Sequence, residues 1–299
     1  MKTRFSQYRV LEVVALSALA TAISLVPAYA DAQSELSQRL VKSHGASAVT
    51  LQIVVKMSAG GGEDQAEREV DGAVLDASGL VVTTNSSIDP TASYAAMSGD
   101  AGGYSSKVVG VKILTNDGRE IPAKVVLRDR DRNLAFLRPL QKLNKPLSGI
   151  GFARGVVAKI GEPVFILGRL GKNGGRQNSI TSERLVSLIA KPRLMYVVLP
   201  NMYTALGNVV FNASGQPLGL LSMRLGMKSQ DAPLPIVIPA GDILEIARQA
   251  PQASQVREAA STPAKKPAIV LNFLFATQGQ HQRHFSSSCR VTCGCKREF

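Results

Sequence analysis

The chain has 299 residues, of which 45% are hydrophobic, and it carries 35 lysines and arginines against 22 acidic residues. The hydrophobic fraction excludes a wholly disordered protein, and three cysteines are too few for a small disulfide scaffold. The net charge of +13 favours anionic partners, such as an envelope polymer or lipid head groups, but specifies no fold.

The N-terminal segment has the three parts of a secretory signal peptide. A basic start precedes an apolar run over residues 10–27, and the sequence Ala-Tyr-Ala ends at Ala30. This order predicts a signal peptide over residues 1–30, cleaved after Ala30. The alternative is an uncleaved membrane anchor, for which the run is short. We therefore expect an exported protein, periplasmic or secreted, with no transmembrane span after cleavage and no nucleic-acid partner.

The next segments predict one helix followed by many short strands. Residues 33–43 place Leu36 and Leu40 on one helical face, and Gly45 ends this helix. Short β-type runs then alternate with turn signals as far as about residue 238, which is typical of an all-β barrel or sandwich. The predicted strands cover residues 48–57, 70–76, 79–84, 108–115, 120–127, 134–138, 156–160, 163–168, 179–189, 194–199, 207–212, 217–223 and 235–238.

Other segments are predicted to be loops, a second helix and a tail. Residues 58–69 and 89–107 are rich in glycine, serine and alanine, which favours surface loops. The charges of residues 128–132 alternate in sign, which predicts a solvated turn rather than a binding stripe. Residues 239–250 predict an amphipathic helix, and residues 251–268 a linker. We expect the tail over residues 269–299 to be disordered.

The tail contains the three cysteines of the chain, Cys289, Cys293 and Cys295, with two histidines before them. Such residues can bind Zn²⁺ or Cu⁺, but their spacing matches no established zinc pattern, so they are a weak metal candidate and we expect no metal site. One disulfide with a spare thiol is the alternative. Because the sequence contains no phosphate loop, dinucleotide fingerprint or H-E-x-x-H motif, we expect no cofactor.

Two segments of the strand-rich region resemble each other. Residues 72–79 and 207–215 both run an apolar strand into an Asp/Asn-Ala-Ser-Gly turn, and a second apolar strand follows each turn. The repeat predicts two similar β-units, each centred on one of these hairpins.

With these elements in this order, residues 36–250 resemble the trypsin-like serine proteases, and within them the HtrA-type periplasmic proteases. The resemblance is carried by residues 72–89, 111–139 and 206–222. It implies two antiparallel six-stranded β-barrels, at about residues 45–140 and 150–240, with an N-terminal and a C-terminal helix. Because the stretch after Ala250 is shorter than the roughly 80 residues of a small domain, we expect no PDZ domain.

The family works through a histidine, an aspartate and a serine in that chain order, and this sequence departs from all three. In the segment Val82-Thr-Thr-Asn-Ser, Ser86 occupies the histidine position, and a hydroxyl cannot act as a base near neutral pH. Asn133 occupies the aspartate position in Asn-Leu-Ala-Phe-Leu, and Leu206 occupies the serine position in Ala-Leu-Gly-Asn. An isobutyl side chain cannot act as a nucleophile.

The alternative is an active serine endopeptidase with misaligned or unusual catalytic residues. A histidine base is not available to it, because residues 45–280 contain no histidine. A serine–lysine pair would have to come from hydroxyls and amines whose spacing favours no pairing. These candidates are Ser86, Ser87 and Ser182 with Lys159 or Lys191.

The sequence therefore predicts an exported, catalytically inactive pseudoprotease rather than an enzyme. We expect it to bind an extended peptide, a protein or an anionic envelope component in the cleft between the barrels. The loop Thr204, Ala205, Leu206, Gly207 and Asn208 would line this cleft where the family holds its substrate.

Overall fold

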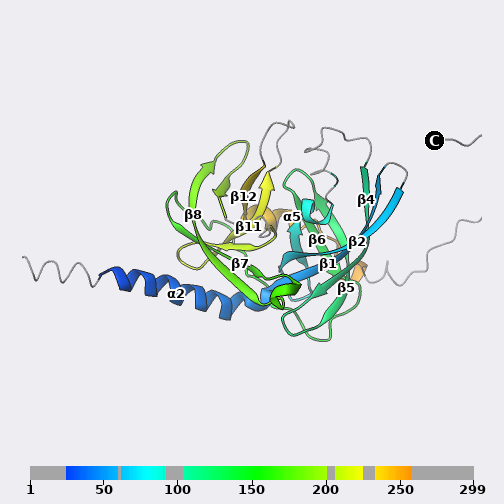
Figure 1. Cartoon of the computed structure of the whole chain (residues 1–299), viewed down its shortest axis with the longest axis horizontal. Helices are drawn as coiled ribbons and strands as arrows, with labels where there is room; N and C mark the ends of the chain where they lie inside the picture. The colour runs from blue at the N-terminus through cyan, green and yellow to red at the C-terminus, as the bar shows by residue number, and fades with distance from the viewer. Residues whose placement is uncertain are drawn as a thin grey trace, which may run out of the picture. The chain divides into compact units, whose positions relative to one another are not determined.

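The computed structural model describes residues 25–59, 62–89, 91, 104–200, 206–224 and 233–256, all within one compact unit, Met1–Thr262. Its strands form two closed antiparallel barrels of six strands each, which confirms the predicted fold class. Figure 1 shows the strands of the first barrel (β1 to β6) gathered on one side and those of the second (β7 to β12) on the other.

The first barrel has the strand order β1-β2-β3-β6-β5-β4, and the second has β7-β8-β9-β12-β11-β10 around its circumference. The two barrels therefore share one connectivity. The strands of the first are β1 (Ala48–Ala59), β2 (Gly62–Val74), β3 (Val81–Thr84), β4 (Tyr104–Leu114), β5 (Glu120–Asp129) and β6 (Leu134–Pro139). Those of the second are β7 (Pro163–Arg169), β8 (Asn178–Ile189), β9 (Met195–Val198), β10 (Val209–Phe211), β11 (Pro217–Arg224) and β12 (Leu234–Pro239).

Three clusters of buried apolar side chains stabilise this fold. Leu51 and Ile53 lie in the core of the first barrel, and Val164 and Ile166 lie in that of the second. A third cluster joins β6 of the first barrel to β10 of the second and includes Phe136. Burial of these apolar side chains, each worth about 2 kcal/mol, fixes the two barrels against each other.

Helices cover this assembly at both ends of the described chain. Helix α2 (Leu25–His44) is longer than predicted, and the expected cleavage point after Ala30 lies within it. No helix among the described residues is long and apolar enough to cross a membrane. The predicted C-terminal helix is α5 (Ala240–Ala247), which buries its apolar side chains in the cluster between the barrels. The shorter helices are η1 (Gly45–Ser47), α3 (Asn85–Ile88) and η2 (Lys172–Gly174).

The C-terminal segment of the described chain is tied to the first barrel. Arg138 is 5% exposed, and its Nε donates a hydrogen bond to the carbonyl oxygen of Pro251 at 2.7 Å. Residues 253–256 form a helical turn, and Val256 is buried. The first part of the predicted linker therefore packs on the barrels, while residues 257–299, including the three cysteines, lie outside the described residues.

The two similar segments form the same turn but occupy different places in their barrels. In the first, the amide of Gly79 donates to the carbonyl of Asp76 at 3.0 Å, and in the second Gly215 donates to Asn212 at 2.9 Å. Both glycines have positive φ, which glycine adopts without strain. The first turn joins the second and third strands of its barrel, but the second joins the fourth and fifth. The repeat therefore reflects a shared turn and not equivalent hairpins.

Three local predictions are wrong at least in part. Residues 104–107, predicted as the end of a loop over residues 89–107, begin strand β4. Residues 58–69, predicted as a loop, continue the β1–β2 hairpin, in which Ala59 pairs with Gly62. Their charges fit a strand because they find partners on β1: Glu63 forms an ion pair with Lys56, and Glu67 accepts a hydrogen bond from the side chain of Gln52 at 2.7 Å. Residues 156–160 form no strand. They lie between turns, and the carbonyl of Val157 accepts a hydrogen bond from the side chain of Asn212 instead of joining a ladder.

Candidate functional site

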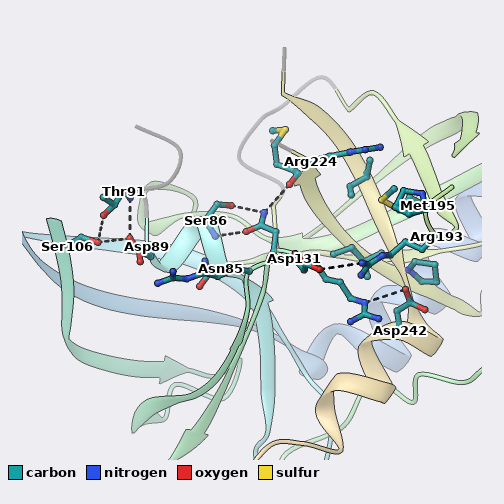
Figure 2. Close-up of a pocket in the computed structure, with 18 of the residues that line it drawn as sticks. Asn85, Ser86, Asp89, Thr91, Ser106, Asp131, Arg193, Met195, Arg224 and Asp242 are labelled. Carbon is teal, nitrogen blue, oxygen red and sulfur yellow. Dashed lines mark hydrogen bonds and ion pairs between the residues drawn. The ribbon is translucent and has the colours of Figure 1, made fainter. Parts of the chain in front are cut away.

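A cavity of about 780 Å³ lies where the two barrels meet. Its wall in the first barrel comes from α3 and from the turn that precedes β6. Its wall in the second barrel comes from β9, the end of β11, β12 and the start of α5. Figure 2 shows Ser86 and Asp89 on one side of it and Arg193, Met195 and Asp242 on the other.

Two of the three positions implied by the resemblance are in direct contact at this cavity. The backbone N–H of Ser86 donates a hydrogen bond to Oδ1 of Asn133 at 2.7 Å. In return, Nδ2 of Asn133 donates to Oγ of Ser86 at 3.0 Å. The chain folds this way because Asn133 ends a turn with φ 53°, a left-handed conformation that asparagine adopts more readily than most residues.

The same asparagine also reaches the second barrel. Its Nδ2 lies 3.2 Å from Oγ of Ser222 and 3.0 Å from the carbonyl oxygen of Met223. A carbonyl oxygen can only accept a hydrogen bond, so this contact requires the nitrogen and not the oxygen of the amide to face β11. Asn133 therefore links α3, its own turn and β11 through one side chain.

The third position, Leu206, is half-buried in the turn that precedes β10 and is not among the residues that line the cavity. Thr204 and Ala205 lie outside the described residues. The next residue, Gly207, has φ 92° and donates its N–H to the carbonyl of Leu221 at 2.8 Å. The structure therefore joins Ser86 to Asn133 by hydrogen bonds, but it places no polar group of Leu206 beside them.

The remaining members of the predicted loop contact β2 rather than the cavity. A Cβ atom at Gly207 would collide with the carbonyl oxygen of Asp71, so only glycine fits there. Asn208 is 7% exposed, and its side chain hydrogen-bonds to the carboxylate of Asp71. Its Oδ1 has no hydrogen-bond partner.

Asp71 was not predicted as a functional residue, and its environment is unusual. Burial raises the pKa of its carboxyl group to about 6, against the opposing effect of hydrogen bonds from the backbone of Arg169 and the side chain of Asn208. Its carbonyl oxygen also accepts a hydrogen bond from Oγ1 of Thr83 at 2.6 Å. The sequence signal was weak, because Asp71 lies between Val70 and Gly72 at the end of a strand that already carries several charged residues.

Arginines surround the cavity, and some of them bridge elements. Nη1 of Arg132 lies 3.1 Å from Oδ2 of Asp129, and Nε of Arg132 lies 3.7 Å from Oδ2 of Asp242 in α5. The predicted turn over residues 128–132 is found only in part, because residues 128 and 129 end β5 and the turn covers residues 130–133. Side chains of this segment contact neighbouring elements and are not simply solvated. Within the described part of the chain, Arg130 and Arg224 line the cavity without an ion-pair partner.

A carboxylate on the first-barrel side is held by hydroxyl groups. Oδ1 of Asp89 accepts hydrogen bonds from Oγ of Ser106 at 2.6 Å and from the N–H of Thr91 at 3.2 Å, as Figure 2 shows. Burial acts to raise the pKa of Asp89, but these hydrogen bonds and Arg128 outweigh it and lower the pKa below the usual range. Asp89 is therefore an ionised structural carboxylate and not a proton acceptor at neutral pH.

No histidine lies in the part of the cavity wall that the structure describes. The described histidine, His44, packs its ring 5.0 Å from that of Phe211, and burial lowers its pKa. In the described ranges no lysine hydrogen-bonds to Ser86, Ser87 or Ser182, and Ser87 instead contacts Oγ1 of Thr84 at 2.6 Å. Nor do the described residues contain a cluster of three histidine, cysteine or acidic side chains that could hold a metal ion.

Comparison with known proteins identifies the family of this double barrel. A comparison with curated proteins gives no match. The family model of the trypsin-like peptidase domain matches residues 70–220, which run from β2 into β11 and include Ser86, Asn133 and Leu206. The match covers half of the chain and most strands of each barrel, and the two six-stranded barrels agree with it. The chain therefore belongs to the trypsin-like peptidase family.

Proposed function

We propose that this protein is an exported, catalytically inactive member of the family, similar to the HtrA type, and that it binds an extended peptide in the cavity between its barrels. The observation that supports this most directly is the reciprocal pair of hydrogen bonds between Ser86 and Asn133. Neither side chain can take a proton from a nucleophile near neutral pH. In the alignment that the resemblance implies, the pair occupies the positions of the family's histidine and aspartate.

The nucleophile position supports the same conclusion. Leu206 has no group that can attack a carbonyl, and residues 45–280 contain no histidine to serve as a base. The hydrogen bonds of Asn133 to β11 leave its amide engaged on both barrels. What remains is a preformed cavity with apolar side chains such as Met195 and Ile236 and with an arginine at its rim, Arg224.

Such a cavity suits peptide binding better than small-ion binding. Its volume of about 780 Å³ lies within the usual range of ligand pockets. Backbone groups at the end of β11 lie at its wall, beside Arg224, so an extended peptide could combine backbone hydrogen bonds with a charged contact. A protein or another anionic envelope component is the alternative partner, and the basic charge of the chain is consistent with either.

The experiment that tests inactivity uses the purified protein with casein as substrate and a fluorophosphonate as a serine-directed probe, with active trypsin treated in parallel as the control. We expect neither cleavage nor labelling. Labelling of one serine would overturn the proposal, and its position would identify the nucleophile of an active endopeptidase.

A peptide array tests the binding half of the proposal. We expect the wild-type protein to bind a subset of peptides, and Arg224→Glu to weaken that binding while the exposed lysine variant Lys142→Glu does not. If Arg224→Glu bound the peptides as tightly as the wild type, the cavity would not be the binding site. A steep loss of envelope association with added salt, without peptide binding, would favour an anionic envelope component instead.

A further inference from the structure

A second groove lies on the first barrel, where two neighbouring strands separate. β4 and β5 pair over only four rungs, from Leu114 with Glu120 to Val111 with Ala123. Beyond this point residues 104–110 of β4 pair with β1 alone, and residues 124–129 of β5 pair with β6 alone. A groove of about 550 Å³ runs between the two separated segments and is lined mainly by them.

Two irregularities in the strands mark the separation. The register of β4 against β1 shifts so that Val109 has no partner, and the register of β5 against β6 shifts at Val126 in the same way. A β-bulge bends its strand and ends regular pairing. Both bulges lie just beyond the last rung of the β4–β5 ladder, so the opening is built into both strands.

The separation leaves two strand edges facing each other. In a strand, alternate residues direct their backbone N–H and C=O groups to each side. Among the described residues, no backbone hydrogen bond joins residues 104–110 to residues 124–129. An exposed row of unpaired backbone groups is a template for an added strand, and here the template has two facing edges.

The side chains around the groove define the charge of its occupant. Lys107 and Arg130 are exposed and Lys124 is half-buried, and all three line the groove. Within the described ranges none of them has an ion-pair partner. The one acidic residue in the lining, Asp89, is already paired with Arg128 at 3.5 Å.

Apolar side chains lie between these cations. Val108 and Val125 line the groove and pack against the core of the first barrel, and each is next in sequence to a lysine, Lys107 or Lys124. A strand presents its side chains alternately to opposite faces. A peptide that alternates apolar and acidic residues could therefore meet valines on one face and lysines on the other.

We propose that the β4–β5 groove binds an extended acidic segment of a partner protein by strand addition. The groove adjoins the cavity between the barrels and shares Asp89, Ser106 and Arg130 with it, but Lys107 and Lys124 line the groove alone. A second copy of this chain does not fit as the occupant, because its own edge would bring the same lysines against Lys107 and Lys124. The partner supplies acidic side chains at alternate positions and a backbone of about six residues, the length of a typical strand.

The test uses a capped heptapeptide of alternating glutamate and valine, labelled for fluorescence anisotropy, with the full chain as the receptor. Two further peptides carry N-methyl groups on one or the other alternate set of amides, because methylation removes the donors that strand pairing needs. We expect the parent peptide to bind and at least one N-methylated peptide to lose about tenfold or more in affinity. We also expect Lys107→Glu/Lys124→Glu to weaken binding about tenfold, while Lys142→Glu leaves it unchanged.

Hydrogen exchange locates the bound peptide on the protein. We expect slower exchange at amides within residues 104–110 and 124–129 when the peptide is bound. Absence of binding, protection elsewhere, or full binding by both N-methylated peptides would each overturn the proposal. Inorganic polyphosphate that bound as tightly, with the same dependence on Lys107 and Lys124, would show a general anion site and also overturn it. None of these results depends on whether the cavity between the barrels binds peptide.

Discussion

Ser86 and Asn133 bind each other reciprocally: the amide oxygen of Asn133 accepts the backbone N–H of Ser86 at 2.7 Å, and its amide nitrogen donates to the Ser86 hydroxyl at 3.0 Å. The residues are distant in sequence, and their contact joins the short helix after β3 to the turn before β6. Because the same amide nitrogen also reaches Ser222 and Met223, this pair links the two barrels beside the cavity, at the two positions to which the resemblance assigns the family's histidine and aspartate.

Replacing Asn133 by aspartate is expected to destabilise the protein at neutral pH. The serine hydroxyls can rotate to donate to a carboxylate, but the carbonyl oxygen of Met223 cannot, so it would face a negative charge. We expect a loss of about 1–3 kcal/mol in the free energy of unfolding, measured by urea denaturation at pH 7. Asn116→Asp, at an exposed turn position, is the matched control. An unchanged midpoint in Asn133→Asp would show that the amide does not join the barrels.

Supplying a hydroxyl at the nucleophile position is expected to restore no activity. In Leu206→Ser the new hydroxyl has no histidine to activate it, because residues 45–280 contain none. We expect fluorophosphonate labelling of Leu206→Ser to equal that of the wild type. Specific labelling at residue 206 would show that another group acts as the base.

Asp71 makes stability depend on pH in a defined direction. Its folded-state pKa of about 6 lies above the value of about 3.9 in an unfolded chain. Between these values the folded state binds more protons, so this contribution to stability is full below about pH 4 and is lost as the pH rises through 6. Asp71→Asn is therefore expected to be more stable than the wild type by about 2 kcal/mol at pH 7, a value reduced for partial solvent screening, and equal to it near pH 4.

Urea denaturation of both proteins from pH 4 to pH 7 measures this difference. The control is Asp131→Asn, since the Asp131 side chain is 87% exposed. A stability difference for Asp71→Asn that did not change with pH would contradict the assignment of the titrating group to Asp71.

The strands and the double barrel could largely be predicted from the sequence, because alternating burial and turn residues are local signals. The β1–β2 hairpin beyond residue 58 was missed because its charged residues gain partners only when the two strands lie side by side, as Lys56 and Glu63 do in their ion pair. The contact of Asn208 with Asp71 was missed for a related reason. It joins segments far apart in the chain, and nothing in either segment alone specifies their approach. The resemblance pointed to Ser86 and Asn133, but it specified neither their mutual hydrogen bonds nor those from Asn133 to β11.

Arg169, the last residue of β7, connects the second barrel to the first. It is 9% exposed, and its Nη1 donates to the carbonyl of Leu114 in the first barrel at 3.0 Å. Its Nε donates to the carbonyl of Arg176 at 2.9 Å. Arg169→Ala would leave both carbonyl oxygens without these donors, and we expect a loss of about 3 kcal/mol in urea denaturation. Arg169→Lys would recover only part of it, because one ammonium group cannot reproduce the fork of a guanidinium.

The control for this test is Arg184→Ala, since Arg184 is exposed and donates only to the carbonyl of Gly161. Its substitution is expected to change stability by less than about 1 kcal/mol. If Arg169→Lys were as stable as the wild type, the single positive charge rather than the two-carbonyl bridge would account for the role of Arg169. The barrels would then depend on the Asn133 junction and the apolar cluster around Phe136 for their attachment.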